Sequence, residues 1–392
     1  MSVQFDKEVL DLEKDIVTFR RHIHQNPELG FEEENTARYI EENIKSFGLK
    51  STRLAKTGVV VTIPGKKSSK ILGIRADIDA LPVQEVEGRI YGSRNVGVHH
   101  ACGHDSHTAI LLGLAKYYSK IPEDDHITLK LFFQPAEEGP GGAKPMIEAG
   151  ALIDPKPDAV IALHVDSNEP AGTANVREGD FTASADQLII KIEGDSGHGA
   201  YPHQAIDPIP VAADLIIILQ RLITRENDPL EPLVLTIGTI KSGTRHNVIA
   251  KSVEMTGTLR TFNEEIRTNI KNRINEIVEN HSKTMRCKGS VEYFDSYASG
   301  YNDPELTKSF LKVGKTLMGE NFKIRPVPQM GAEDFYEFGY TNDKLPVMMY
   351  FLGCRNEEKG ITGEHHSPEF DVDEDCFKYG LQLYVNFINS YL

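Results

Sequence analysis

Residues 107–133 read HTAILLGLAKYYSKIPEDDHITLKLFF, and this stretch contains both kinds of element from which the fold is built. The mostly apolar run 107–118 predicts a buried helix, and the short β-rich run 127–133 predicts a strand. Strands that alternate with helices indicate an α/β layer.

The same alternation continues on both sides of this stretch. Predicted helices cover 9–23, 32–47, 304–318 and 374–391, and predicted strands cover 59–63, 71–74, 159–164 and 347–352. The strand 159–164 is expected to end at His164, at the edge of the sheet where ligands usually bind. The sequence therefore predicts an α/β fold built from both ends of the chain.

A different order of elements interrupts this pattern. Strands are predicted at 187–192, 233–240, 252–261 and 290–294, and helices at 208–223 and 264–281. The order β-α-β-β-α-β is that of a ferredoxin-like α+β unit. A chain of 392 residues also exceeds what one hydrophobic core usually organises. We predict a catalytic domain in two segments, 1–182 and 297–392, with an inserted domain at 183–296.

The composition excludes several classes of partner. The chain has 43 Lys and Arg against 58 Asp and Glu, which gives a formal net charge of −15. Such a surface repels nucleic acid and anionic membranes. The longest apolar run is too short for a membrane span, and the N-terminus lacks the apolar core of a signal peptide, so the expected location is the cytoplasm. Four scattered cysteines make no disulfide framework.

The densest chemical cluster is HHACGHDSH at residues 99–107, with four histidines and one cysteine. Imidazole and thiolate suit Zn, Co and Ni, and less naturally Mn, and Gly103 permits the tight turn that lets Cys102 and His104 face one centre. A polar loop with chance histidines is the alternative.

A pair of carboxylates follows the strand 127–133. Glu137 and Glu138 are adjacent, and two like charges side by side are costly unless a cation neutralises them. The pair makes most sense with one carboxylate as metal ligand and the other as general base, although a solvated acidic turn is the simpler interpretation of the pair alone. His164 and His366 are two further isolated candidates.

Four segments together resemble one family: RADIDALP (75–82), HACGHD (100–105), QPAEE (134–138) and HSP (366–368). They are similar to the aminoacylase, hippurate hydrolase and carboxypeptidase family of metal-dependent amidohydrolases, which are zinc-type metallopeptidases. The match spans nearly the whole chain, and residues 141–150 and 351–357 look most like archaeal thermostable carboxypeptidases. The resemblance implies a zinc-exopeptidase-like catalytic domain, with a mixed sheet flanked by helices, and an inserted domain that dimerises and closes over the site.

The resemblance also implies a set of metal ligands. It makes Cys102, His104, Glu138, His164 and His366 the ligands of a divalent metal pair, with Zn as the first expectation and Co, Mn or Ni as alternatives. Cys102 takes the place of a carboxylate that bridges the two metals in more distant relatives. Asp79 is expected to orient a ligating histidine, while contact of Asp77 or Asp105 with the metals stays open.

The remaining site residues have distinct expected roles. Glu137 is the candidate base that takes a proton from water and returns it to the leaving amine. His198, in a Gly-rich turn, resembles the family histidine that reaches the active site of a partner subunit and stabilises an oxyanion. Arg260 and Asn247 match the contacts to a substrate carboxylate. Glu333 is placed near the site without a firm role.

The predicted function is metal-dependent hydrolysis of the amide bond in an N-acyl amino acid or at the C-terminus of a short peptide, by a homodimer or a dimer of dimers. One alternative is a biosynthetic N-acetyl amino acid or diamino acid deacetylase. Another is a relative that binds metal or peptide without turnover. A thiol enzyme with Cys102 as the nucleophile would not need the glutamate pair, His164 or His366.

Overall fold

The computed structural model describes residues 3–391 and divides into two compact units. The first unit comprises the chain up to Gly179, Tyr301–Val327 and the chain from Asp334 onwards, and the second comprises Asp180–Gly300 and Pro328–Glu333. The predicted divisions after residues 182 and 296 lie near these limits, although 328–333 group with the second unit. Residues 1, 2 and 392, which the predicted domains include, lie outside the described part.

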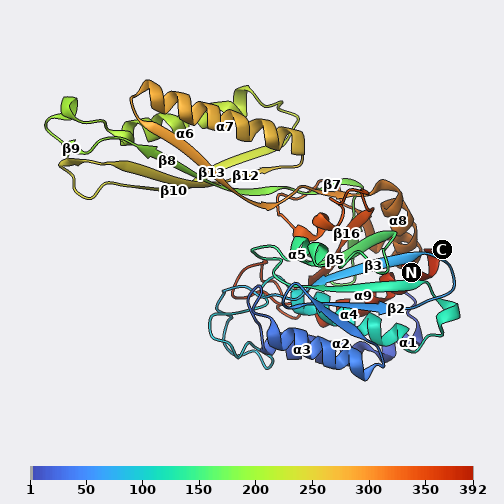
Figure 1. The fold of residues 1–392 in the computed structure, drawn as a ribbon. Coiled ribbons are helices and arrows are strands. Elements are labelled where there is room, and N and C mark those ends of the chain that lie inside the picture. The colour runs from blue at the N-terminus through green and yellow to red at the C-terminus, as the bar shows by residue number, and fades with distance from the viewer. Residues whose placement is uncertain (1–2, 392) are drawn as a thin grey trace. The chain divides into compact units, whose positions relative to one another are not determined.

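The first unit is built on an eight-stranded mixed sheet (Figure 1). Its strands, in spatial order, are β1 (Ser51–Leu54), β2 (Gly58–Ile63), β4 (Thr128–Gln134), β3 (Ile71–Asp77), β5 (Ala159–Pro170), β16 (Val347–Arg355), β6 (Ala174–Val176) and β15 (Phe322–Ile324). The central strands β4, β3, β5 and β16 run parallel, and β2 and β6 are antiparallel to their neighbours on the β4 and β16 sides. The predicted α/β fold with a mixed sheet is therefore confirmed.

Helices cover this sheet. They are α1 (Lys7–Asp11), α2 (Glu13–Gln25), α3 (Glu34–Ser46), α4 (His104–Tyr118), α5 (Ala143–Glu148), α8 (Pro304–Met318) and α9 (Phe377–Ser390). Short 3-10 turns lie at Glu123–Asp125, Gly319–Asn321, Asp334–Phe338 and Glu374–Cys376. The predicted helix 9–23 is interrupted at Leu12, and the predicted helix 374–391 begins with a 3-10 turn. None of the helices in 3–391 combines the length and the apolar character needed to cross a bilayer.

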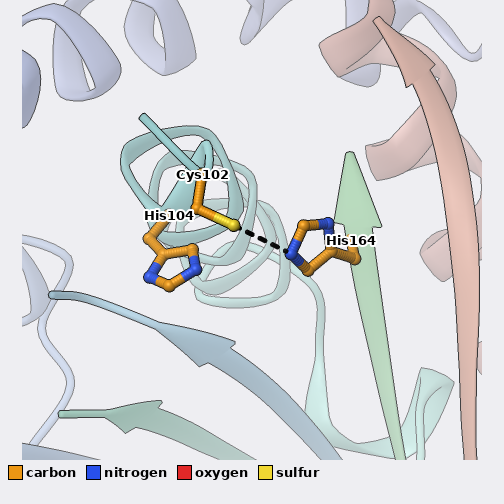
Figure 2. Close-up of side chains that lie close together, drawn as sticks. All are labelled: Cys102, His104 and His164. Atoms are coloured by element: carbon orange, nitrogen blue, oxygen red, sulfur yellow. Dashed lines mark hydrogen bonds between the residues drawn. The ribbon is translucent and has the colours of Figure 1, made fainter. Parts of the chain in front are cut away.

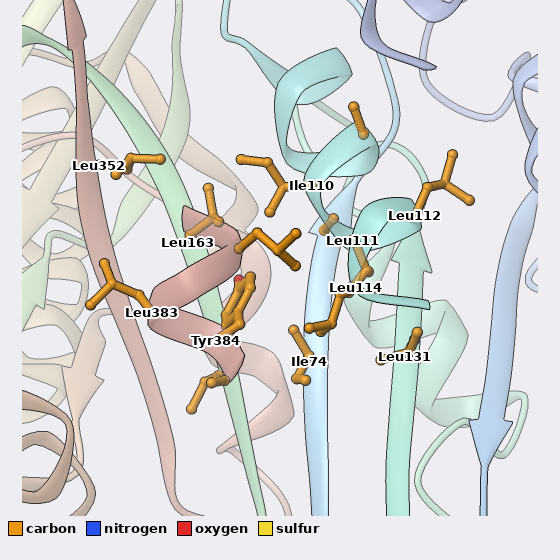
Figure 3. Close-up of a cluster of buried hydrophobic side chains, with 14 of the residues drawn as sticks. Ile74, Ile110, Leu111, Leu112, Leu114, Leu131, Leu163, Leu352, Leu383 and Tyr384 are labelled. Carbon is orange, nitrogen blue, oxygen red and sulfur yellow. The ribbon is translucent and has the colours of Figure 1, made fainter. Parts of the chain in front are cut away.

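Helix α4 is apolar on nearly every side, and it is enclosed by the sheet and by other helices. It contacts β3 on the sheet and the helices α2 and α9, and a helix that is hydrophobic all round is a buried one. Figure 3 shows Ile110, Leu111 and Leu114 of α4 among side chains of the sheet and of α9, where all three are at most 1% exposed. The core thereby fixes the helix whose first turn carries His104 and His107.

The structure corrects two predicted boundaries. Helix α4 begins at His104 rather than at 107, because Gly103 adopts a left-handed φ of 90° that ends the preceding turn. Strand β5 does not end at His164 but continues to Pro170, because β16 pairs alongside it up to Arg355. His164 therefore lies inside a strand.

The second unit contains a four-stranded antiparallel sheet and two helices. The strand order is β10 (Leu233–Ser242), β12 (Ser252–Thr261), β8 (Ala185–Glu193) and β13 (Lys288–Tyr297), with helices α6 (Pro208–Arg225) and α7 (Glu264–Thr284). This is the order expected for the predicted β-α-β-β-α-β unit. Smaller elements of this unit are β9 (Gly197–His198) paired with β11 (Val248–Ile249), and a 3-10 turn at Pro202–Gln204. The chain crosses from one unit to the other within β7 (Gly179–Thr182) and β14 (Gly300–Asn302), which pair with each other.

Candidate metal centre

The parallel strands of the first unit bring the predicted ligands to one edge of the sheet. Asp77, at the end of β3, pairs with Gln134, at the end of β4, so the segments that follow each strand emerge together. His164 on β5 lies two residues beyond Ala162, which pairs with Arg75 on β3. Ligand sites form at the carboxyl ends of parallel strands.

Two groups of potential ligands share Cys102. In the first group, Cys102 Sγ lies 3.5 Å from Nε2 of His164, and His104 completes the group. Figure 2 shows these three side chains, which come from the turn before α4, from the first residue of α4 and from β5. In the second group, Nε2 of His366 lies 3.2 Å from Oε1 of Glu138, and Cys102 is again the third member. The structure thus brings the five predicted ligands together, with the sulfur common to both groups.

The donor atoms fit a divalent metal pair. Nε2 of His104 is buried and has no hydrogen-bond partner, a state that costs free energy unless another group satisfies it. Sulfur, imidazole nitrogen and carboxylate oxygen together are the ligands preferred by Zn and similar metals. A metal ion held by the first group would satisfy this nitrogen.

Neighbouring groups orient the ligands. Nδ1 of His104 lies 3.2 Å from Oδ1 of Asp79, while Oδ2 of Asp79 accepts a 2.9 Å hydrogen bond from the Glu138 amide. Nδ1 of His164 donates to the carbonyl of Val165 at 2.7 Å. Each contact leaves the Nε2 of its histidine facing the centre, which is the usual outer arrangement of a metal site. Asp79 therefore contacts both His104 and the backbone of Glu138, and its orienting role stays a prediction.

Asp77 and Asp105 are held by other partners. Asp77 accepts from Arg75 Nη1 at 2.7 Å and lies 2.6 Å from Nδ1 of His107. Asp105 accepts from Arg20 and lies 2.7 Å from His24, in a buried cluster of its own. Burial alone would raise the pKa of both carboxyls, but the neighbouring positive groups hold it well below the usual range.

Glu137 lies beside the ligands. Its Oε2 is 3.9 Å from Nε2 of His104, and the residue is 5% exposed. Glu137 follows Ala136, whose φ of 53° is left-handed, so a sharp turn directs the two adjacent glutamates. The geometry suits a base that acts next to the metals.

The second-unit candidates are not all brought together. Residues His198 and Asn247 are neighbours, because β9 pairs with β11 and the Gly199 amide donates to the Asn247 carbonyl at 2.9 Å. Arg260, however, lies near the far end of β12, roughly 26 Å from the start of that strand at about 3.3 Å per residue. One chain therefore cannot place Arg260 and Asn247 on the same small carboxylate.

The structure shows the surroundings of Arg260 and Glu333 within the second unit. Arg260 Nη1 donates to the carbonyl of Met330 at 3.1 Å, and Glu333 is buried at 4% exposure within the segment Pro328–Glu333. The sequence did not assign a supporting role to Gln134, Asp334 or Glu33 of the first unit. Gln134, the last residue of β4, stands in the motif QPAEE, whereas Glu33 had no signal.

Proton release should accompany metal binding. Burial alone would lower the pKa of His104, but Asp77, Asp79 and Glu138 raise it to about 10, and burial with Glu138 and Glu137 raises the pKa of Cys102. Both groups are thus protonated at pH 7 and must lose a proton to bind metal. We expect release of at least about two protons, and an apparent affinity that rises at least about 100-fold per pH unit between about pH 6 and 8.

Calorimetric titration with Zn²⁺ in buffers of different ionisation enthalpy would count these protons, and chelator competition would follow the affinity. An affinity independent of pH over this range would contradict the protonated state of His104 and Cys102.

Comparisons with known proteins agree with this chemistry. Residues 73–390 match the model of peptidase family M20/M25/M40. The chain is 39% identical to thermostable carboxypeptidase 2 of Saccharolobus solfataricus, over 95% of this chain and 94% of the relative. It is 37% identical to the N-acetyldiaminopimelate deacetylase of Geobacillus sp. (strain WCH70), over 95% and 96%.

A solved structure is similar over the whole length. The YxeP protein of Bacillus subtilis, described as a dinuclear metal binding peptidase of the M20 family, aligns with a TM-score of 0.83 and 29% identity, covering 98% of this chain and 99% of that one. The predicted family, the metal dependence and the hydrolysis of amide or peptide bonds are thereby confirmed. The chain belongs to peptidase family M20/M25/M40.

Proposed function

We propose that this enzyme removes the acyl group of an N-acyl amino acid or the C-terminal residue of a short peptide. The observation that carries the proposal is the pair of ligand groups sharing Cys102, with Glu137 beside them. This arrangement suits two metals and one base, and a carboxypeptidase among the relatives of this chain supports the proposal.

The roles proposed for the residues follow from their positions. Divalent metals supply Lewis acidity when bound, which polarises an amide carbonyl and acidifies water. Glu137 takes the proton from the attacking water and passes it to the nitrogen of the leaving amine, so that the amine departs neutral. His198 donates a hydrogen bond to the oxyanion, while Arg260 and Asn247 bind the substrate carboxylate.

The separation of Arg260 from Asn247 supports a site shared between two subunits. His198 and Asn247 lie together at one end of the second unit, whereas Arg260 lies near the other end of β12. We propose that His198 and Asn247 act in the site of a partner chain. Strand β10 is an edge strand of its sheet, and Ile217 on α6 is 62% exposed, as expected where a second copy packs.

Mixed dimers test the sharing directly. We expect dimers with Glu137→Ala in one chain and His198→Ala in the other to show about half of the wild-type activity. In such a dimer, the chain that keeps Glu137 receives an intact His198 from its partner, so this site is complete. The other site of the dimer lacks both residues. Co-expression with two different affinity tags and tandem purification would provide the mixed dimers, and each homodimer is the inactive control. Mixed dimers as inactive as the homodimers would refute the shared site.

The second candidate function is deacetylation of an N-acetylated diamino acid. The relative named N-acetyldiaminopimelate deacetylase is nearly as similar to this chain as the carboxypeptidase. Both reactions use the same centre, because each cleaves an amide next to a free carboxylate. The two candidate functions therefore differ only in the size and charge of the acyl group and of the amino acid that the substrate carries.

A panel of substrates tests the proposal. Benzyloxycarbonyl-, benzoyl- and acetyl-amino acids, N-acetyl diamino acids and dipeptides would be assayed before and after chelation, with Zn, Co and Mn added back. Turnover restored by metal on acyl amino acids or dipeptides supports the proposal, and turnover on N-acetyl diamino acids alone supports the second candidate. Activity that survives chelation would point to a thiol mechanism at Cys102, and no turnover with any metal would refute both hydrolytic proposals. The native metal and the cytoplasmic location stay predictions.

A further inference from the structure

The segment that carries Glu137 and Glu138 is an irregular loop between the end of β4 at Gln134 and the start of α5 at Ala143. Three buried carboxylates accept hydrogen bonds from its backbone. Asp334 accepts from the Gly142 and Ala143 amides at 2.8 and 3.0 Å, and Asp79 accepts from the Glu138 amide at 2.9 Å. The third carboxylate, Glu33, accepts from the Ala136 amide at 2.8 Å. The loop is therefore held at three places: at Ala136, which precedes Glu137, at Glu138, and at its end at Gly142 and Ala143.

Glu33 belongs to a distant part of the chain. It lies immediately before α3 and is 0% exposed. Its Oε1 accepts the Ala136 amide hydrogen bond, and its Oε2 accepts a 2.7 Å hydrogen bond from the Thr57 hydroxyl. The carboxylate thus joins the loop to the start of strand β2, next to Thr57.

The neighbouring backbone contacts the same loop. A Cβ on Gly30 would lie 2.5 Å from the carbonyl oxygen of Gly139 and 3.1 Å from Ala136. Only a glycine allows this close approach. The segment from Gly30 to Glu33 therefore contacts the loop at two points, by packing and by a hydrogen bond.

Ala136 is the residue that needs support. Its φ of 53° lies in the left-handed region, which is strained for a non-glycine residue, and such backbone persists only where its surroundings hold it. Without Glu33, the Ala136 amide would be a buried hydrogen-bond donor with no acceptor, which costs free energy. Because Glu137 follows directly, rotation at Ala136 would swing the side chain of Glu137 away from the ligands.

A carboxylate at this position is unfavourable for stability by itself. Burial raises the pKa of Glu33 to about 7, although the hydrogen bond from Thr57 opposes the shift. Its two oxygens accept from Thr57 and from the residue that precedes Glu137. These two hydrogen bonds therefore offset part of the free-energy cost of burying the Glu33 carboxylate.

We propose that Glu33 is a positioning residue of the hydrolytic reaction, which fixes the amide of Ala136 and with it the direction of Glu137. The inference rests on the function proposed for Glu137. Glu33 acts through the loop, because its hydrogen bonds go to Ala136 and Thr57 rather than to the ligands. Displacement of a catalytic group by about 1 Å can cost 100-fold in rate, so loss of the anchor should lower kcat rather than raise KM.

Two substitutions of similar size separate the hydrogen bond from the volume of the side chain. Glu33→Met removes both acceptors, whereas Glu33→Gln keeps one carbonyl oxygen for the Ala136 amide. Glu32→Met is the matched control, because Glu32 is the exposed neighbour. Hydrogen exchange at the Ala136 amide, followed by mass spectrometry with residue-level fragmentation, measures how well the hydrogen bond to Glu33 protects this amide. The measurement does not require an active enzyme.

We expect Glu33→Met to exchange the Ala136 amide at least about tenfold faster and to lower kcat at least about tenfold, with KM within about threefold and the same metal content. Glu33→Gln should stay within about threefold of the wild type in both measurements, and Glu32→Met should match the wild type. Unchanged exchange at Ala136 in Glu33→Met, or equal losses in the Met and Gln variants, would overturn the proposal.

A second variant decides the matter if Glu33→Met does not fold. Thr57→Val keeps Glu33 but removes the hydroxyl that donates to it. We expect exchange at Ala136 to be about threefold faster and kcat to be about threefold lower, and wild-type values for both would overturn the proposal. An inactive wild-type enzyme would refute the proposed function, while the exchange data would still decide whether Glu33 holds the loop.

Discussion

Replacing Glu137 by Gln is expected to lower kcat about 1,000-fold, while the protein still binds its metals. The amide has the shape of the carboxylate but cannot take a proton from water or return it to the leaving amine. Glu137 is buried with its Oε2 3.9 Å from His104, close enough to act on a reactant held at the ligand groups. Steady-state kinetics with metal analysis of the purified variant would measure both effects.

Two neighbouring variants provide the controls for this result. Glu138→Gln should lose metal as well as activity, because Glu138 belongs to the ligand group with Cys102 and His366. Glu148→Gln, on the exposed side of α5, should leave both unchanged. A Glu137→Gln enzyme that keeps more than about a tenth of the wild-type kcat would show that another group moves the proton.

Loss of Cys102 is expected to remove both metals, whereas loss of His164 or His366 removes one. Cys102 is the only member common to the two groups, since His164 belongs to the first and His366 to the second. After dialysis, we expect close to no metal in Cys102→Ala and about one metal ion per chain in His164→Ala and in His366→Ala, against about two in the wild type. Elemental analysis of the dialysed proteins measures these ratios.

The control for the cysteine substitution is Cys287→Ala, because Cys287 lies in the second unit, outside both ligand groups. It should keep the wild-type metal content. If Cys102→Ala retained one metal ion, the sulfur would be a ligand of one site only, and the shared role proposed for it would be wrong.

Much of the fold could be predicted because local pattern and packing agree. The predicted helix 304–318 has the observed limits of α8, since Asp303 caps its start, Pro304 stands at the first position and Gly319 follows its end. The β-α-β-β-α-β order likewise predicts the sheet of the second unit, because short connections favour few topologies. The failures at the start of α4 and the end of β5 arose from a left-handed glycine and from pairing with the distant strand β16.

The candidate site divides in the same way. Its chemical groups are readable in the sequence because ligand and base types cluster in short motifs, as in HACGHD and QPAEE. The anchors of those motifs are not readable, because Glu33 and Asp334 reach the loop from segments far away along the chain.

The sequence by itself therefore determined the family and the kinds of element, and it supplied the candidate donor atoms of the metal centre, since these depend on residue type and short-range spacing. Only the tertiary structure decided that Cys102 belongs to two ligand groups, that buried carboxylates hold the glutamate loop, and that Arg260 lies far from Asn247. The reason is physical: each of these features is a distance between side chains on different strands and loops. Such distances follow from strand register and core packing rather than from any local pattern.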